Sequence, residues 1–238
     1  MQGIEGLSVK IFADGANLAA MQELYQRPYI KGFTTNPTLM RKAGITDYAA
    51  FARDVLRTIP DRPISFEVFS DEFTEMERQA REIASWGSNV YVNIPVTNTL
   101  RQPAHDLVRR LSRDGLQVNV TAVMTLDQVQ AVTDALADGA ASCISVFAGR
   151  IADTGRDPLP LMADALRIMT RAPRAELIWA SSREVLNVLQ ADSIGCHIIT
   201  VTSDLLNRLA IVGKPLEEYS LDTVKMFYDD ATAAEFSV

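Results

Sequence analysis

The sequence predicts an α/β fold: a single (β/α)8 barrel, or TIM barrel, with an extra helix at its C-terminal end. Three observations lead to this prediction. Strand-like and helix-like segments alternate eight times along the chain. The connections are short, and each helix supplies the crossover that neighbouring parallel strands need. The length of 238 residues is close to what eight such units require.

Each expected strand is a short apolar run. In chain order these runs cover residues 9–13, 30–35, 63–69, 89–95, 117–123, 141–147, 176–180 and 197–202. Amphipathic or charged helical stretches follow them at residues 17–26, 48–59, 71–86, 100–113, 126–137, 158–170, 183–190 and 204–209. A further helix at about 221–234 closes the chain. No linker or low-complexity stretch interrupts the alternation, so residues 1–238 are expected to form one domain.

A doubly wound open sheet is the alternative architecture. It usually has fewer strands, and a Gly-rich phosphate-binding turn often follows its first strand. Here the first strand is followed by Asp14-Gly15-Ala16-Asn17, which is not such a turn. The closed barrel is therefore the preferred prediction.

Composition narrows the classes of function. The net charge of −7 argues against nucleic acid as a partner, although it leaves room for a local basic pocket. No apolar run approaches the roughly 20 residues of a membrane helix, and residues 1–5 do not resemble the start of a signal peptide. Cys143 and Cys196 lie in apolar runs and are expected to be buried free thiols. These features predict a cytoplasmic protein that does not bind membranes.

The strand at 89–95 is central to the prediction of function. Side chains alternate along a strand, so Tyr91 and Asn93 share one face, and Val90, Val92 and Ile94 share the other. The aliphatic face suits packing under helices, and the polar face suits the inside of a barrel near its mouth. Asn93 is therefore expected to lie in a site.

Polar residues also mark the ends of the other strands, where the chemistry of such a barrel takes place. The polar residues at or near the first seven strand ends are Asp14, Thr34, Thr35, Asn36, Glu67, Asn93, Asn119, Thr121, Ser145, Arg150, Ser181 and Arg183. One such residue alone is usually a helix cap or a turn residue. Seven consecutive strands with this ending favour a functional site.

Two chemical subsets stand out among these residues. Asp14 and Glu67 are carboxylates suited to general acid–base catalysis through a bound water, with a helix cap and a hydrogen-bonding residue at the rim of the core as the structural alternatives.

The second subset consists of Ser145, Arg150, Ser181 and Arg183. Two guanidinium groups and two hydroxyls from adjacent strands can hold a phosphate dianion, with surface ion pairing as the alternative. His105 and His197 do not combine into a metal-ligand set, and the chain has no Gly-x-Ser-x-Gly or Walker motif.

Seven segments resemble the transaldolase family, in order and spacing, along essentially the whole chain. They are Phe12-Ala13-Asp14-Gly15-Ala16-Asn17, residues 30–39 with the specific Thr-Thr-Asn-Pro, Val90-Tyr91-Val92-Asn93-Ile94-Pro95, Asn119-Val120-Thr121, Ser145-Val146-Phe147-Ala148-Gly149-Arg150, Ala180-Ser181-Ser182-Arg183 and residues 220–228. The last segment is similar to the short class of the family, which includes fructose-6-phosphate aldolase.

The resemblance implies a (β/α)8 barrel that transfers a dihydroxyacetone unit between sugar phosphates, without a metal or organic cofactor. It implies acid–base roles for Asp14 and Glu67, a water-positioning role for Thr121 and a substrate contact for Asn36. It implies a phosphate grip formed by Ser145, Arg150, Ser181 and Arg183. Asn119 and Phe147, which lie in the resembling segments, are also expected to bind substrate. It also implies a homo-oligomer, with rings as one form of assembly, because in the short class the last helix packs on a neighbouring subunit.

The sequence departs from the family at the nucleophile. The family carries a Schiff-base lysine at the position of Asn93, and an amide nitrogen cannot form an iminium because its lone pair is delocalised. None of the five lysines of the chain lies at a strand position that points into the barrel near its mouth. Gly15 is a milder departure, since many members have threonine there.

Three functions follow from this departure. The first is a transaldolase-type site without its nucleophile, and a natural loss or a deliberate substitution would both fit it. The second is an enzyme that enolises or isomerises a sugar phosphate with Asp14 and Glu67, using Asn93 as an amide donor to the carbonyl oxygen. The third is a sugar-phosphate-binding protein without catalysis.

Overall fold

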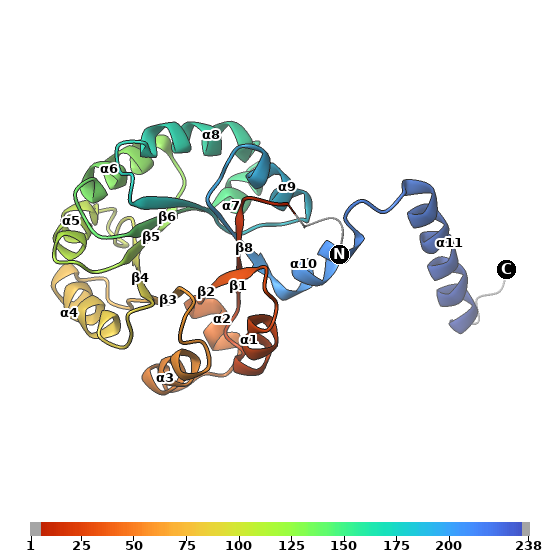
Figure 1. Ribbon diagram of the computed structural model, residues 1–238, viewed down its shortest axis with the longest axis horizontal. Coiled ribbons are helices and arrows are strands. Elements are labelled where there is room, and N and C mark those ends of the chain that lie inside the picture. Colours follow the sequence, from red (N-terminus) through yellow and green to blue (C-terminus); the bar gives the residue numbers. More distant parts are fainter. Residues whose placement is uncertain (1–5, 235–238) are drawn as a thin grey trace.

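The computed structural model, which describes residues 6–234, is a closed barrel of eight parallel strands (Figure 1). The strands are β1 (Lys10–Asp14), β2 (Ile30–Thr34), β3 (Ile64–Glu67), β4 (Val90–Pro95), β5 (Val118–Val123), β6 (Ser142–Val146), β7 (Ala175–Trp179) and β8 (Ile198–Thr202). Each strand pairs with the next, and β1 pairs with β8 from Lys10↔Ile198 to Asp14↔Thr202, which closes the ring. The predicted barrel is confirmed.

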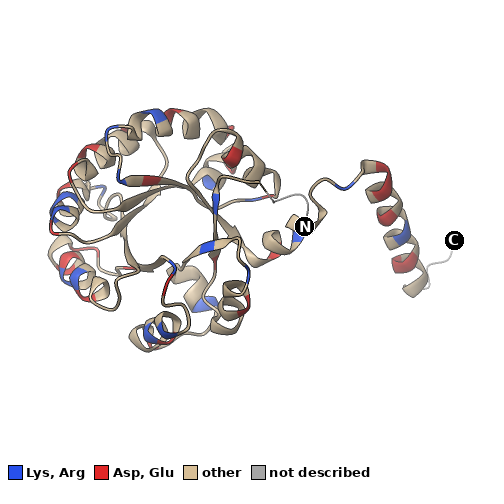
Figure 2. Cartoon of the chain, in the orientation of Figure 1, with Lys and Arg blue, Asp and Glu red and all other residues tan. Residues whose placement is uncertain are grey.

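Helices surround the barrel on its outer side, except the last helix, which stands apart (Figure 1). They are α1 (Leu18–Tyr25), α2 (Pro37–Lys42), α3 (Tyr48–Thr58), α4 (Phe73–Ala84), α5 (His105–Arg113), α6 (Leu126–Leu136), α7 (Ala148–Ala152), α8 (Pro158–Met169), α9 (Leu186–Ser193), α10 (Ser203–Arg208), the 3₁₀ turn η1 (Leu209–Ile211) and α11 (Leu216–Ala233). Charged residues of both signs are spread over these outer helices (Figure 2).

Two short helices, α2 and α7, were not among the predicted elements. The start of α2 follows from local chemistry: the Asn36 side chain accepts a hydrogen bond from the Leu39 amide at 3.0 Å, and Pro37 occupies the first helical position. Helix α7 has five residues, too few to show a helical period in the sequence.

Helix α5 begins at His105, five residues later than predicted. The intervening residues form a loop organised by Asn98, whose Oδ1 accepts hydrogen bonds from the amides of Leu100 and Gln102 at 3.1 and 2.9 Å. Arg101 has a φ of 63°, which is incompatible with a continuous α-helix. The side-chain amide therefore competes with helix formation in this segment.

The apolar core has two layers. Val90, Val92 and Ile94 lie in the outer layer, between the strands and the helices. Tyr91 lies in a smaller cluster with Phe12, Cys143, Ile178, Ala180 and Ile198. These residues alternate with the outer-layer residues of the same strands, so they fill the inside of the barrel. Strand alternation on β4 is therefore as predicted, and Asn93 points inward.

Helix α11 stands away from the barrel (Figure 1) and buries none of its residues. It starts at Leu216 rather than near 221, because Pro215 comes directly before it and Glu217 and Glu218 in its first turn favour the N-terminal end of a helix. Its exposed large apolar residues are Leu216, Tyr219, Leu221, Val224, Met226, Phe227 and Tyr228. None of the described helices combines the length and the apolar character that crossing a bilayer requires.

Candidate active site

Two carboxyl groups lie at the C-terminal ends of β1 and β3. Burial raises the pKa of Asp14 to about 6, although hydrogen bonds from the Thr34 and Asn36 side chains act in the opposite direction. Burial raises the pKa of Glu67 to about 7, and a hydrogen bond from Asn93 opposes this shift. Burial thus brings the pKa of both carboxyl groups close to neutral pH, as acid–base catalysis at that pH requires.

A chain of four side chains crosses the barrel mouth from β3 to β6. Asn93 donates from Nδ2 to Oε2 of Glu67 at 3.1 Å, and its Oδ1 accepts from Nδ2 of Asn119 at 2.8 Å. Ser145 Oγ donates to Oδ1 of Asn119, also at 2.8 Å. The strand register explains the chain, because Glu67, Asn93 and Asn119 lie side by side on consecutive strands. Sequence reasoning grouped Ser145 with the arginines, whereas here it is buried in this network.

Asn93 is held in one orientation. It is 4% exposed, and Nδ2 has a second, longer contact with the Thr35 carbonyl oxygen at 3.4 Å. Both amide hydrogens therefore face protein acceptors, and the amide oxygen is also occupied. The side chain at this position forms part of the hydrogen-bonded floor of the site.

Thr121 lies beside the same network on β5. It is buried, and it precedes Ala122, which has a φ of 60°. The pairing of β5 with β6 shifts register between Val120 and Val123, so a bulge forms at the end of this strand. The bulge, which strand periodicity in the sequence does not reveal, sets the position of Thr121.

The arginines lie at a different part of the mouth, Arg150 in α7 after β6 and Arg183 in the loop after β7. Arg183 binds both oxygens of Asp153 through one edge of its guanidinium, Nε to Oδ1 at 3.1 Å and Nη2 to Oδ2 at 2.5 Å. Arg150 lies over the ring of Phe147, with its Cζ 5.8 Å from the ring centroid. Ser181 precedes Arg183 and has a φ of 62°. Sequence reasoning missed Asp153, which has no motif of its own.

Gly149 allows the two loops to pack together. A Cβ at this position would collide with the Ser181 carbonyl oxygen and lie 3.2 Å from Nε of Arg183. The Gly149 amide donates to the Ala180 carbonyl at 3.3 Å. The glycine thus brings the segment that carries Arg150 against the segment that carries Arg183.

Tyr48 is a second residue that sequence reasoning missed. The pairing of β2 with β3 ends at Thr34↔Ser65, which leaves the Glu67 backbone beyond the ladder. The Tyr48 hydroxyl takes the place of a strand there, accepting from the Glu67 amide at 2.6 Å and donating to the Glu67 carbonyl at 3.1 Å. Tyr48 therefore fixes the end of β3 that presents the Glu67 carboxyl.

The five lysines lie elsewhere in the described chain. Lys10 starts β1 and pairs with Glu176 at 2.5 Å, and Lys31 donates to the Pro28 carbonyl at 2.9 Å near the start of β2. The remaining three are Lys42 in α2, Lys214 before α11 and Lys225 in α11. The strand ends that carry the network thus contain no amine.

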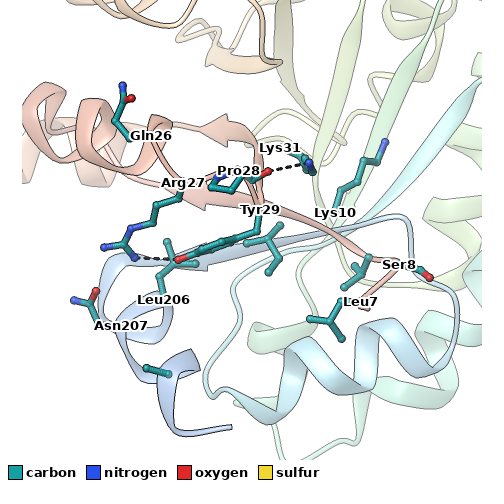
Figure 3. A pocket seen from close by; sticks show the side chains of 13 residues that line it. Leu7, Ser8, Lys10, Gln26, Arg27, Pro28, Tyr29, Lys31, Leu206 and Asn207 are labelled. Atoms are coloured by element: carbon teal, nitrogen blue, oxygen red, sulfur yellow. Dashed lines mark hydrogen bonds between the residues drawn. The ribbon is translucent and has the colours of Figure 1, made fainter. Parts of the chain in front are cut away.

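A cavity of about 890 Å³ lies near the opposite end of β1 and β2 (Figure 3). Lys10, Arg27, Tyr29 and Lys31 are among its lining residues, and Arg27 Nη1 donates to the Tyr29 hydroxyl at 3.0 Å. The cavity contains none of the predicted site residues. Within residues 6–234, no group of three or more His, Cys, Asp or Glu side chains is arranged to hold a metal ion.

Comparison with known proteins identifies the lineage of this barrel. The family model described as transaldolase/fructose-6-phosphate aldolase matches residues 11–238. The chain belongs to this transaldolase family. A probable transaldolase of Dehalococcoides mccartyi is 34% identical over 202 residues, which are 84% of this chain and 90% of that protein. A probable transaldolase of Thermoanaerobacter sp. is 34% identical over 218 residues, or 91% of this chain and 95% of that one.

Solved structures outside the transaldolase family share the barrel. Dihydrodipicolinate synthase from Rhodopseudomonas palustris superposes with a TM-score of 0.58 at 14% identity, over 94% of this chain and 79% of that one. 3-Keto-L-gulonate-6-phosphate decarboxylase from Vibrio cholerae gives a TM-score of 0.55 at 11% identity, over 82% and 88%. At such low identity these similarities establish the fold alone.

Proposed function

We propose that this transaldolase-family protein binds a ketose or aldose phosphate at the barrel mouth and is impaired in Schiff-base transfer and aldol cleavage. The observation that carries the proposal is Asn93. It stands on β4 at the position that the family resemblance assigns to the nucleophilic lysine, and its amide is buried and hydrogen-bonded to Glu67 and Asn119. An amide cannot attack a carbonyl to form an iminium, and the iminium is the electron sink for carbon–carbon cleavage.

The rest of the site supports retained recognition and proton transfer. In this proposal Asp14 acts as base and Glu67 exchanges protons with a water positioned by Thr121, since burial raises the pKa of both carboxyl groups toward neutral pH. Arg150, Ser181 and Arg183 are proposed to bind the phosphate group. Asn36, Asn119, Ser145 and Phe147 are proposed to shape the sugar subsite.

Two other functions receive less support from the geometry. An enolising enzyme would need Asn93 to donate to the substrate carbonyl, yet both of its amide hydrogens face Glu67 and the Thr35 carbonyl. A binding protein without catalysis has no need for two partly buried carboxyl groups with raised pKa values, since ionising a carboxyl with such a pKa is destabilising.

The decisive test is a paired assay of the natural chain and Asn93→Lys, with Asn93→Met as a control of similar length that lacks the amine. Each protein is assayed for cleavage of fructose 6-phosphate and for transfer to erythrose 4-phosphate, and each is treated with borohydride in the presence of substrate. We expect turnover and a borohydride-trapped adduct only in Asn93→Lys. Turnover by the natural chain that is lost in Asn93→Lys would show that Asn93 supports different chemistry.

Substrate binding is tested separately, by calorimetric titration of the natural chain with fructose 6-phosphate, sedoheptulose 7-phosphate and glyceraldehyde 3-phosphate. Arg150→Ala and Arg183→Ala should each weaken binding by about 1.5–3 kcal/mol, the typical worth of a hydrogen bond to a charged group. If none of the three ligands binds, the proposed sugar-phosphate site is wrong. Unchanged affinity in both variants would place the phosphate elsewhere.

We also propose that the protein is a homo-oligomer in the cytoplasm. Helix α11 supports the oligomer, because its seven large apolar side chains are exposed and an apolar surface of this kind usually marks an interface. The buried free thiols of Cys143 and Cys196 fit a reducing compartment. Light scattering of Phe227→Glu, compared with the natural chain, should show a smaller particle, whereas an unchanged mass would exclude this face of α11 as the contact.

A further inference from the structure

The contact between Arg183 and Asp153 has a consequence for ligand binding. Both carboxylate oxygens face the guanidinium, with Nε–Oδ1 and Nη2–Oδ2 distances of 3.1 and 2.5 Å. This is the bidentate geometry that a guanidinium also offers to two oxygens of a phosphate group. One carboxylate and one phosphate therefore cannot use the same edge of Arg183 at the same time.

Asp153 also interacts electrostatically with Arg150, the other arginine at the barrel mouth. It follows α7, three residues after Arg150. The hydrogen bonds from Arg183 lower the pKa of Asp153, and the charges of Arg183 and Arg150 act in the same direction. The carboxylate is therefore fully ionised at neutral pH, is bound to Arg183 and is stabilised by the charge of Arg150.

The backbone keeps Arg183 where Asp153 can reach it. The Asn187 Oδ1 accepts hydrogen bonds from the amides of Arg183 and Glu184, at 2.8 and 3.2 Å, and Asn187 is itself buried. Gly149 holds the α7 segment against the loop that carries Arg183. The side chains of Asp153 and Arg183, in contrast, are about half exposed, at 53% and 48%. The carboxylate can therefore swing into solvent while the arginine backbone stays fixed.

We propose that Asp153 is an internal competitor for the anion subsite: its carboxylate holds the Arg183 guanidinium until the phosphate group of the sugar displaces it. Exposed ion pairs of this kind contribute little to stability, so the exchange is easy for a phosphate dianion. The competitor weakens binding and speeds release of the phosphate ester. This inference rests on the proposed sugar-phosphate site.

The test is calorimetric titration of the natural chain, Asp153→Asn and Arg183→Ala with fructose 6-phosphate, and with inorganic phosphate as the minimal probe. Asparagine keeps the size of the side chain and removes its charge. We expect Asp153→Asn to bind both probes about three- to tenfold more tightly, with a smaller gain at high salt. Asp138→Asn, which removes a carboxylate paired with Arg113 at 3.4 Å on the outer surface, is the matched control and should bind as the natural chain does.

Whether Asp153→Asn binds the two probes more tightly or more weakly than the natural chain distinguishes a competitor from a positioning residue. If Asp153→Asn binds more weakly or equally well while Arg183→Ala still loses affinity, Asp153 is a positioning residue or a bystander, and the proposal of a competitor is wrong. If Arg183→Ala binds like the natural chain, or if neither probe binds any protein, the proposed phosphate site itself fails, and the inference fails with it.

Discussion

Replacement of Glu67 by glutamine should make the protein more stable at alkaline pH and leave it nearly unchanged near pH 4.5. Glutamine has the same shape and keeps an oxygen that can accept the hydrogen bond from Asn93 Nδ2, which is 3.1 Å from Glu67 in the natural chain. The substitution therefore removes the titration of this group and little else.

The magnitude follows from the pKa. Burial raises the pKa of Glu67 from 4.5 to about 7, so ionisation costs more in the folded chain than in the unfolded one. At about 1.4 kcal/mol per pH unit the full difference is about 3 kcal/mol. Glu67 retains some contact with solvent, which screens charge, and we therefore expect about 2 kcal/mol. A carboxyl whose pKa is raised on folding stabilises fully below pH 4.5, and this contribution is lost as the pH rises through about 7.

The assay is urea unfolding of the natural chain and Glu67→Gln between pH 4.5 and 8.5, with Glu184→Gln as an exposed control. The free energy of unfolding of Glu67→Gln, minus that of the natural chain, should grow by about 2 kcal/mol up to pH 7 and then level off. The control should show no such growth. A difference that stays constant over the whole range would refute the reasoning, because Glu67 would then titrate alike in both states.

Two further substitutions test how the site is held in place. Tyr48→Phe should lower the free energy of unfolding by about 1–3 kcal/mol, because the Glu67 amide loses its hydrogen-bond partner at 2.6 Å and no strand replaces it. Tyr25→Phe removes an exposed contact with Asp61 and should have a much smaller effect in the same denaturation experiment. Gly149→Ala should destabilise by about 1–3 kcal/mol and weaken phosphate binding in calorimetry, since its Cβ collides with the loop that carries Arg183. Gly15→Ala, whose Cβ meets nothing within 4 Å, should leave the melting temperature almost unchanged, and equal effects of the two alanines would contradict the packing argument.

The barrel itself was predictable from sequence for a local reason. Strand and helix periods, short connections and chain length are all encoded in neighbouring residues, and together they leave few topologies. The two-sided character of β4 was also predictable, because alternation along a strand decides which side chains point inward. The positions of Asp14, Glu67 and Asn93 at strand ends followed from the same rule.

The sequence determined the chemical groups available at the mouth, including the absence of an amine at position 93. Only the tertiary structure decided how they are connected. Ser145 joins the amide network instead of the arginines because its hydroxyl reaches Oδ1 of Asn119 from two residues beyond Cys143, the register partner of Asn119 on β6. Tyr48 and Asp153 reach the site from a helix and a loop 19 and 30 residues away from their partners. Such contacts depend on strand register, a bulge and loop packing, which are set by the whole closed barrel and leave no local pattern in the chain.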